Sequence, residues 1–404
     1  MVAGLSAVVA TLLGMRNRNI LISGAGIGGP ALAHWLVRAG RTVTVVEKAP
    51  ALRPGGQAVD FKGETHLTVL TRMGILDDVR RLQTGGPDQE IVDAHGRRLA
   101  VLPGAFTGGD LEIRRGDLSR ILYERTSSHC EYVFGDSITS LTDTPGGVHV
   151  TFERSAPRTF DLVVGADGIH SAVRRLAFGP ETEFVRFLGY YYALAEVEKG
   201  LGEVPWMYNE PGRLVAAGGP KAQAFFVFAS AAELDYDRYD TGRQKDLLAR
   251  AYAGMGWRTP EVIDAVRRSG DVYLDSISQV RIDRYSAGRV VLLGDAAYGN
   301  TLGGFGTGLA VVGAYVLAGE LAEAGGDHRA AFAAYERQMR AYARIARNGN
   351  TGPFLAPATP ARIRMRNWTF KYGFLLGLML KMSDKFATDI ALKDYAALTG
   401  RVQR

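Results

Sequence analysis

The sequence predicts an α/β fold in which a domain with a parallel sheet is interrupted by an antiparallel β-sheet domain and followed by C-terminal helices. Near the start, strand, glycine turn and helix alternate over residues 19–74, a pattern typical of parallel β-α-β units. Between residues 187 and 229, β-rich aromatic segments are separated by Pro and Gly turns, which is typical of antiparallel strands. Apolar strands at 272–281 and 289–293 then return to the first sheet, so we expect its domain to be discontinuous.

The remaining elements follow from periodicity. Apolar residues at helical spacing predict helices at residues 30–39, 64–73, 77–83, 112–128, 244–252, 260–267, 310–324 and 329–347. Short alternating strands are expected over 132–160 and a buried parallel strand at 162–165. We therefore predict an N-terminal extension at 1–18, a first domain at 19–76, 95–178 and 275–347, a sheet domain at 77–94 and 179–274, and a C-terminal helical segment at 348–404.

A glycine pattern lies at the first junction between strand and helix. Its residues are Gly24, Ala25, Gly26, Ile27, Gly28 and Gly29. Glycines at this place permit a tight turn and a close approach of backbone to a pyrophosphate. The N-terminal N–H groups of the following helix would stabilise the phosphate charge. The pattern indicates a dinucleotide site.

The second strand, residues 42–46, ends in an acid. This residue, Glu47, lies 21 residues after Gly26 and is followed by Lys48. At this spacing a carboxylate can accept hydrogen bonds from a ribose 2′-hydroxyl, and it disfavours a 2′-phosphate. The sequence therefore favours FAD or NAD over NADP in this slot.

Two later segments carry acids directly after apolar strands. The strand 162–165 leads into Asp167 and Gly168, and the strand 289–293 leads into Gly294 and Asp295. In a parallel sheet, residues that follow the strands face the ligand crevice. Asp295 is therefore a candidate ligand-binding residue.

Taken in this order and spacing, the three segments resemble the group A flavoprotein monooxygenases, from Asn19 to about Arg347. Residues 55–61 and 112–118 are most similar to the tetracycline-inactivating branch and to related antibiotic-tailoring and polyketide-tailoring enzymes. The resemblance implies a Rossmann-like FAD-binding domain, discontinuous, with an inserted antiparallel β-sheet substrate domain. It also implies tightly but non-covalently bound FAD, with NADPH or NADH as a transient electron donor.

The resemblance assigns roles to individual residues. Asp295 would bind the ribityl hydroxyls of FAD, and Arg115 would contact the flavin or its ribityl chain. Asp60 would lie beside the flavin, Arg53 would help to receive the nicotinamide nucleotide, and the Asp167-Gly168 motif would serve both nucleotides. Ordinary alternatives exist: Asp167 as a turn-former, Arg115 as a surface residue at a helix start and Arg53 as a loop charge.

A second glycine run precedes the helix that begins near Leu309. It contains Gly303, Gly304, Phe305, Gly306, Thr307 and Gly308. Its backbone N–H groups could stabilise the negative charge of a reduced flavin, whereas the alternative is a flexible loop before a core helix. The chain departs from the family at Tyr298, where the pattern has His, and it lacks the proline expected shortly afterwards. We expect flavin binding to survive these changes.

The leading hypothesis is oxygenation of a bulky aromatic or polycyclic small molecule by NAD(P)H and O2 through a flavin C4a-hydroperoxide. The substrate would lie between the flavin and the sheet domain, a common place for a pocket. Candidate walls are Tyr190, Tyr192, Trp206, Tyr208, Phe226 and Phe228. Because side chains alternate along a strand, core packing is the alternative for any one of them.

Three other functions remain open. A halogenase would have this fold, but the chain lacks the W-x-W-x-I-P type of segment. A reductase would share the first motif and would consume no O2. A non-catalytic flavin-binding sensor or partner subunit would oxidise NAD(P)H slowly and would not respond to aromatic compounds.

Composition excludes other classes of function. The chain has 404 residues and a net charge of +6, but its basic residues are scattered, and the cluster Arg362, Arg364 and Arg366 is interpreted as a solvated helix face rather than a nucleic-acid site. Cys130 is the only cysteine, so any electron transfer must depend on a bound cofactor. No His/Cys cluster suggests a metal. The apolar stretches 3–13 and 370–382 are too short to span a bilayer, so we expect a cytoplasmic protein without stable membrane insertion.

Overall fold

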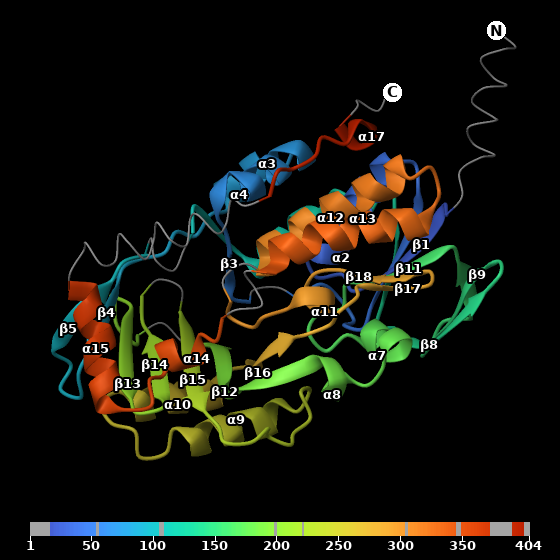
Figure 1. The fold of residues 1–404 in the computed structure, drawn as a ribbon. Helices are drawn as coiled ribbons and strands as arrows, with labels where there is room; N and C mark the ends of the chain where they lie inside the picture. Colours follow the sequence, from blue (N-terminus) through green and yellow to red (C-terminus); the bar gives the residue numbers. More distant parts are fainter. Residues whose placement is uncertain are drawn as a thin grey trace, which may run out of the picture.

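The computed structural model describes residues 17–53, 56–104, 109–197, 200–219, 222–303, 306–344, 349–371 and 390–399 (Figure 1). Most of the predicted N-terminal extension and of the apolar stretch 370–382 lies outside these ranges. Within them, the predicted mixed α/β fold is confirmed: several sheets are combined with helices.

The first sheet has six strands in the order β17-β18-β11-β1-β2-β7. Its strands are β1 (Asn19–Ser23), β2 (Thr42–Glu47), β7 (Glu131–Phe134), β11 (Leu162–Gly165), β17 (Ser286–Ala287) and β18 (Val290–Leu292). All neighbours pair in parallel except β17 and β18. The central strands β1 and β11 are buried almost throughout, which explains their continuous apolar sequence. The carboxyl ends of β1, β11 and β18 therefore lie at one edge of the sheet.

Helices α2 (Gly28–Arg38) and α7 (Ala172–Phe178) contact this sheet directly. Further helices pack around α2 and against one another: α3 (Gly63–Met73), α4 (Leu76–Arg81), α6 (Arg115–Glu124), α12 (Gly306–Glu323) and α13 (His328–Tyr342). In Figure 1, α12 and α13 lie side by side, and α12 also contacts α2 and α3. Because it is surrounded in this way, α12 is apolar on nearly all sides and is buried along most of its length.

The second large sheet has seven strands in the order β16-β12-β15-β14-β13-β4-β5. Its strands are β4 (Gln89–Val92), β5 (Arg98–Leu102), β12 (Val185–Glu196), β13 (Trp206–Glu210), β14 (Arg213–Ala217), β15 (Gln223–Ala229) and β16 (Val272–Val280). Neighbours are antiparallel except β13 and β4. Two smaller sheets are formed by β8 (Ile138–Thr144), β9 (Gly147–Phe152) and β10 (Arg158–Phe160), and by β3 (Ala58–Phe61) and β6 (Leu111–Arg114).

The two faces of the seven-stranded sheet have different neighbours. Its outer face packs against α9 (Thr241–Ala251) and α10 (Thr259–Arg268), which lie below it in Figure 1. Its inner face packs against α14 (Gly352–Leu355), α15 (Pro360–Lys371) and the loop residue Leu302. The short helices α8 (Glu181–Phe184), α11 (Asp295–Tyr298) and α17 (Ala396–Thr399) complete the described elements.

Some predicted boundaries differ from the structure. Residues 112–128 do not form one helix, because the chain pairs with β3 as strand β6 up to Arg114 before α6 begins. Strand β5 belongs to the seven-stranded sheet although we predicted 95–178 to lie in the first domain. The expectation that the strand at 272–281 returns to the first sheet is also wrong, because β16 pairs with β12 at the edge of the seven-stranded sheet. Helix α4, predicted in the sheet domain, contacts α3 and α6 instead. These segments carry no periodicity that distinguishes one sheet partner from another.

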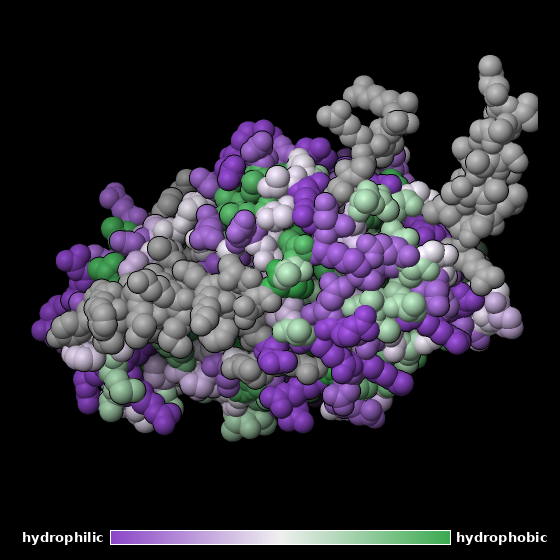
Figure 2. All heavy atoms as spheres, turned by 45° about the horizontal axis from the view of Figure 1, so that its top comes forward, coloured by the Kyte–Doolittle hydropathy of each residue, from purple (hydrophilic) through white to green (hydrophobic). Residues whose placement is uncertain are grey.

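On the face shown in Figure 2, hydrophilic residues predominate and hydrophobic residues form only small groups. Among the described residues, no helix combines the length and the apolar composition that crossing a bilayer requires.

Candidate active site

The first glycine turn is closely packed against the end of β11. Gly24 has a φ of +107°, and a Cβ there would come within 2.5 Å of the Ala166 carbonyl oxygen. A Cβ on Gly29 would come within 1.9 Å of the Gly24 carbonyl oxygen. Helix α2 begins immediately after this turn, and its N-cap residue Ile27 gives it no side-chain cap. The turn therefore presents bare backbone and uncapped N–H groups, as a pyrophosphate site requires.

Glu47 is fixed beside this turn. Its Oε2 accepts a hydrogen bond of 2.8 Å from the Ala25 N–H, and its Oε1 accepts one of 2.8 Å from the Ala49 N–H. Each carboxylate oxygen keeps a further lone pair. Glu47 can therefore also accept hydrogen bonds from a ribose.

The other predicted residues near β2 lie on the surface. The Lys48 ammonium is 4.6 Å from the centroid of the Tyr239 ring, and the Arg53 side chain is exposed. Asp60 is half-buried on β3, opposite Glu112 of β6.

Asp167 is committed to the local turn. Its carboxylate accepts hydrogen bonds from the Ser171 hydroxyl, from the Val173 N–H at 3.1 Å and from the Ser23 hydroxyl at 3.4 Å. These contacts fix the connection between β11, Gly168 and α7. The alternative interpretation of Asp167 as a turn-former therefore has direct geometric support.

Asp295 occupies a hollow beside Arg115. Solvent can reach the Asp295 side chain, but protein atoms surround it on most sides. This partial loss of water raises the pKa of its carboxyl, and the positive charge of Arg115 opposes that shift. A carboxyl that solvent reaches and protein surrounds lies in a concave place. Among the described residues its carboxylate has no hydrogen-bond partner. A Cβ on Gly306, at the start of α12, would lie 3.3 Å from Asp295 Oδ1.

Arg115 joins this hollow to the first glycine turn. Its Nη2 lies 3.6 Å from the position that a Cβ on Gly26 would take. Four separate segments therefore converge, through Gly26, Arg115, Asp295 and Gly306. Gly303 contacts Asn300, whereas Gly304, Phe305 and Gly55 lie outside the described residues.

The sheet domain borders the same hollow. Burial raises the pKa values of Tyr192 and Tyr273, and the positive charge of Arg115 acts on both hydroxyls in the opposite direction. The two rings are 5.7 Å apart, and Tyr273 remains 39% exposed. Leu302, with a φ of +57°, connects the loop after α11 to the inner face of the sheet.

The predicted substrate walls lie on two different faces. Tyr190 and Tyr192 are on the inner face, with Leu194, Met207 and Phe225. The other four, Trp206, Tyr208, Phe226 and Phe228, belong to the core between the sheet and the helices α9 and α10. Side chains alternate along each strand, and the sequence does not reveal which set faces the first domain. The four outer-face residues are therefore removed from the candidate pocket.

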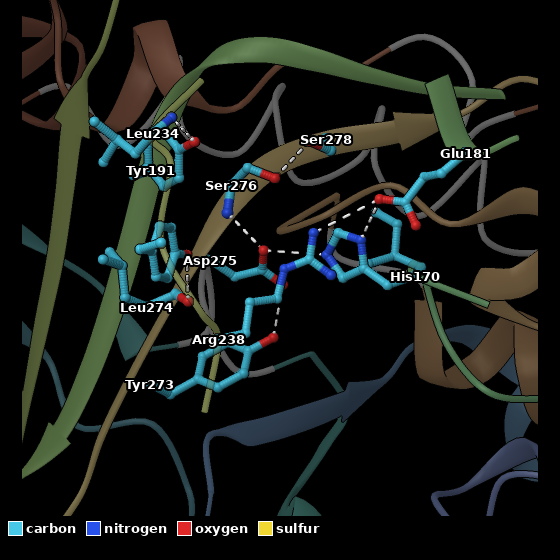
Figure 3. A network of polar contacts seen from close by, with 12 residues as sticks. His170, Glu181, Tyr191, Leu234, Arg238, Tyr273, Leu274, Asp275, Ser276 and Ser278 are labelled. Carbon is cyan, nitrogen blue, oxygen red and sulfur yellow. Dashed lines mark hydrogen bonds and ion pairs between the residues drawn. The ribbon is translucent and has the colours of Figure 1, made fainter. Parts of the chain in front are cut away.

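Sequence reasoning missed a polar network between the two domains (Figure 3). His170, which follows the Asp167-Gly168 motif, points its two ring nitrogens at Glu181 Oε1 (2.8 Å) and Asp275 Oδ1 (3.2 Å). Asp275 Oδ2 accepts a hydrogen bond of 2.8 Å from the Tyr273 hydroxyl. Arg238 lies 3.6 Å from Glu181. No local signal could reveal a contact between residues 105 positions apart.

The residues present fit FAD. The bare glycine turn fits a pyrophosphate, Glu47 fits a ribose, and the Asp295 carboxylate in the hollow fits a polyhydroxylated chain. The hollow is bounded on its other side by aromatic residues of the sheet, which fit a flat ring system.

Comparisons with known proteins agree with this geometry. The family described as "FAD binding domain" matches residues 17–347. An uncharacterized protein of Mycobacterium tuberculosis is 41% identical over 338 residues, covering 80% of this chain and 90% of that protein. A flavin-dependent monooxygenase of Legionella longbeachae is 35% identical over 339 residues, covering 81% and 86%. The crystal structure of the tetracycline destructase Tet(55) superposes with a TM-score of 0.79 at 33% identity, covering 94% of this chain and 99% of that one. The chain belongs to the FAD binding domain family and is a flavin-dependent monooxygenase related to the tetracycline destructases.

Proposed function

We propose that the protein uses NADPH or NADH and O2 to oxygenate a bulky aromatic or polycyclic small molecule, of the kind found among polyketides and antibiotics. One observation carries this proposal. The hollow has Arg115 and Asp295 on the side of the first domain and Tyr192 and Tyr273 on the side of the sheet. A cofactor and a flat organic molecule can meet there.

The residues of the first domain would hold the cofactor. The backbone around Gly24 and Gly26 would bind the pyrophosphate, and Glu47 would accept hydrogen bonds from the adenosine ribose. Asp295 would accept hydrogen bonds from the ribityl hydroxyls, with Arg115 beside it. When bound, FAD supplies hydride acceptance from the nicotinamide and activation of O2.

The chain's own residues would bind, orient and shield. The N-terminal end of α12 presents backbone N–H groups and a positive dipole end, which stabilise negative charge. On the opposite side, the half-buried residues Leu194 and Phe225 of the inner-face cluster would form an apolar wall that excludes water and favours a flat ring. No acid–base pair is required, because the cofactor carries the chemistry.

The relatives support the substrate class. A solved relative at 33% identity over nearly the whole chain is named a tetracycline destructase. That name indicates a polycyclic small molecule as the substrate of that protein, and this likeness supports a substrate of the same class for this chain.

The proposal can be tested by following flavin reduction. Purified, yellow protein is mixed anaerobically with NADPH, and separately with NADH, across a panel of polyketide-like phenols and quinones. We expect at least one compound to accelerate loss of the flavin absorbance and, in air, to stimulate O2 uptake. Reduction without O2 uptake would favour a reductase, a halogenated product a halogenase, and slow oxidation indifferent to every compound a non-catalytic flavin protein.

A further inference from the structure

The inner face of the seven-stranded sheet carries a large apolar cluster. Its cluster contains residues such as Ile91, Leu214, Val227 and Ile277. At the edge strand β16, however, Tyr273 and Asp275 share that face with Tyr192, because Asp275 is the register partner of Tyr192. The polar groups of the sheet wall nearest to Arg115 are therefore concentrated at one place.

The Tyr273 hydroxyl is used as a donor toward the sheet. Its proton is donated to Asp275 Oδ2 at 2.8 Å. A phenol has only one proton, so toward any other group the Tyr273 oxygen can act only as an acceptor. The neighbouring Tyr192 hydroxyl donates to this oxygen and so takes one of its two lone pairs. Because Tyr273 is 39% exposed, the second lone pair is available to a bound molecule.

The contact with His170 favours the ionised form of Asp275. Burial alone would raise the pKa of Asp275, but its hydrogen bond and ion pair with His170 lower it overall. Burial lowers the pKa of His170, whereas its bonds to Asp275 and Glu181 raise it overall. Both ring nitrogens face carboxylates, so both carry protons. The remaining charged neighbours, Arg238 and Arg174, lie 3.6 Å and 4.0 Å from Glu181.

We propose that Tyr273 determines substrate specificity by accepting a hydrogen bond from an aromatic hydroxyl group, and that Asp275 and His170 are positioning residues that keep it in this acceptor state. The proposal rests on the proposed function and deepens it, because it names the substrate class as neutral phenols or enols. A methyl ether has no proton to donate to the Tyr273 oxygen. A phenolate oxygen is itself only an acceptor, so it cannot form a hydrogen bond with the Tyr273 oxygen either. The site would therefore reject such compounds because they leave the second lone pair of the Tyr273 oxygen without a hydrogen-bond donor, and not because of their size.

A matched pair of ligands tests this. We would titrate the FAD-loaded protein with 1-naphthol and with 1-methoxynaphthalene, following perturbation of the flavin absorbance. The wild type should bind 1-naphthol about tenfold more tightly, since the ether leaves the second lone pair of the Tyr273 oxygen without a donor. Tyr273→Phe keeps the ring and should bring the two affinities to within about twofold by weakening 1-naphthol alone.

Two further variants make the test specific. Tyr239→Phe removes the hydroxyl of an exposed tyrosine outside the network and should leave the tenfold ratio unchanged. Asp275→Asn offers Tyr273 an amide in place of the carboxylate, so its hydroxyl is no longer committed as a donor and the ratio should fall. Flavin content checks that each variant is folded.

The outcomes separate this proposal from the proposed function. If Tyr273→Phe keeps the wild-type ratio, Tyr273 is not the selecting acceptor, although the protein can still be an aromatic monooxygenase. If the wild type binds both compounds equally, the proposal also fails. If the wild type binds neither, the assignment of the hollow as an aromatic pocket fails with it.

Discussion

The hydroxyl of Tyr298 lies where a side chain on Gly313 would be. A Cβ on Gly313 would come within 2.2 Å of that oxygen. Tyr298 is buried, and its hydroxyl donates to the Leu309 carbonyl at 3.3 Å, while Tyr335 donates to the Leu292 carbonyl at 3.0 Å. The tyrosine that replaces the family's histidine is thus a core residue that ties α11 to α12.

Gly313→Ala should destabilise the protein by about 1–3 kcal/mol, because the added methyl group overpacks the contact with Tyr298. Thermal or urea unfolding measures this. Gly270→Ala is the matched control, since a Cβ there meets nothing within 4 Å. The double variant Gly313→Ala with Tyr298→Phe should recover part of the loss, and full additivity of the two changes would contradict the contact.

Asp295→Ala should weaken FAD binding about 100-fold, because hydrogen bonds from ribityl hydroxyls to a carboxylate are lost. Binding is measured by titrating the apoprotein with FAD and following the flavin absorbance. Asp283→Ala, which removes an exposed carboxylate elsewhere, should bind FAD as the wild type does. Equal affinities for all three proteins would remove Asp295 from the cofactor site.

His170→Gln should cost about 2 kcal/mol of folding free energy near pH 5.5, through loss of charged hydrogen bonds. The folded pKa of His170 is raised, so its linked stabilisation is present below about pH 6.5 and is lost as pH rises through the folded value. The pKa values of Asp275 and Glu181 are lowered, so the stabilisation linked to their ionisation is present above about pH 4.3 and is lost as pH falls. The deficit of the variant should therefore shrink toward alkaline pH.

Urea unfolding at a series of pH values measures this deficit. His95→Gln, at an exposed position outside the network, is the control and should show no comparable pH dependence. A deficit for His170→Gln that stays constant between pH 5.5 and pH 9 would show that the imidazolium charge is not what matters.

Phe225 and Phe226 form a natural pair on opposite faces of β15. Phe226→Ala should cost about 3–5 kcal/mol in stability, because Phe226 is fully buried in the core with α9 and α10. Phe225→Ala should cost less and should weaken the binding of aromatic ligands several-fold. Unfolding and ligand titration of both variants check which face of the sheet each residue occupies. A larger stability loss for Phe225→Ala, with weaker ligand binding for Phe226→Ala, would refute the assignment.

The cofactor half of the molecule was largely predictable from the sequence. The strand, turn and helix around Gly24 and Gly26 are set by local geometry, and Glu47 lies where its spacing predicts. The contact between the Gly24 turn and Ala166 was not predicted, because apolar sequence identifies β1 and β11 as buried strands without showing that they are neighbours.

The substrate half was less predictable, for physical reasons. Alternation along β12 separates Tyr190 and Tyr192 from Tyr191, but only tertiary packing decides which set faces the first domain. The pairing of His170 with Asp275 depends on how the two domains pack together, and no local sequence pattern around either residue predicts this contact. The face on which each tyrosine lies and the contact between His170 and Asp275 could be identified only from the three-dimensional structure.

The most direct test of the central claim is the fate of oxygen from isotopically labelled O2. The FAD-loaded protein is supplied with NADPH, or NADH, and with the aromatic compound that best accelerates flavin reduction, under 18O2, and the product is analysed by mass spectrometry. We expect one 18O atom in each product molecule. A product free of 18O, or consumption of the nicotinamide with release of hydrogen peroxide alone, would contradict the account.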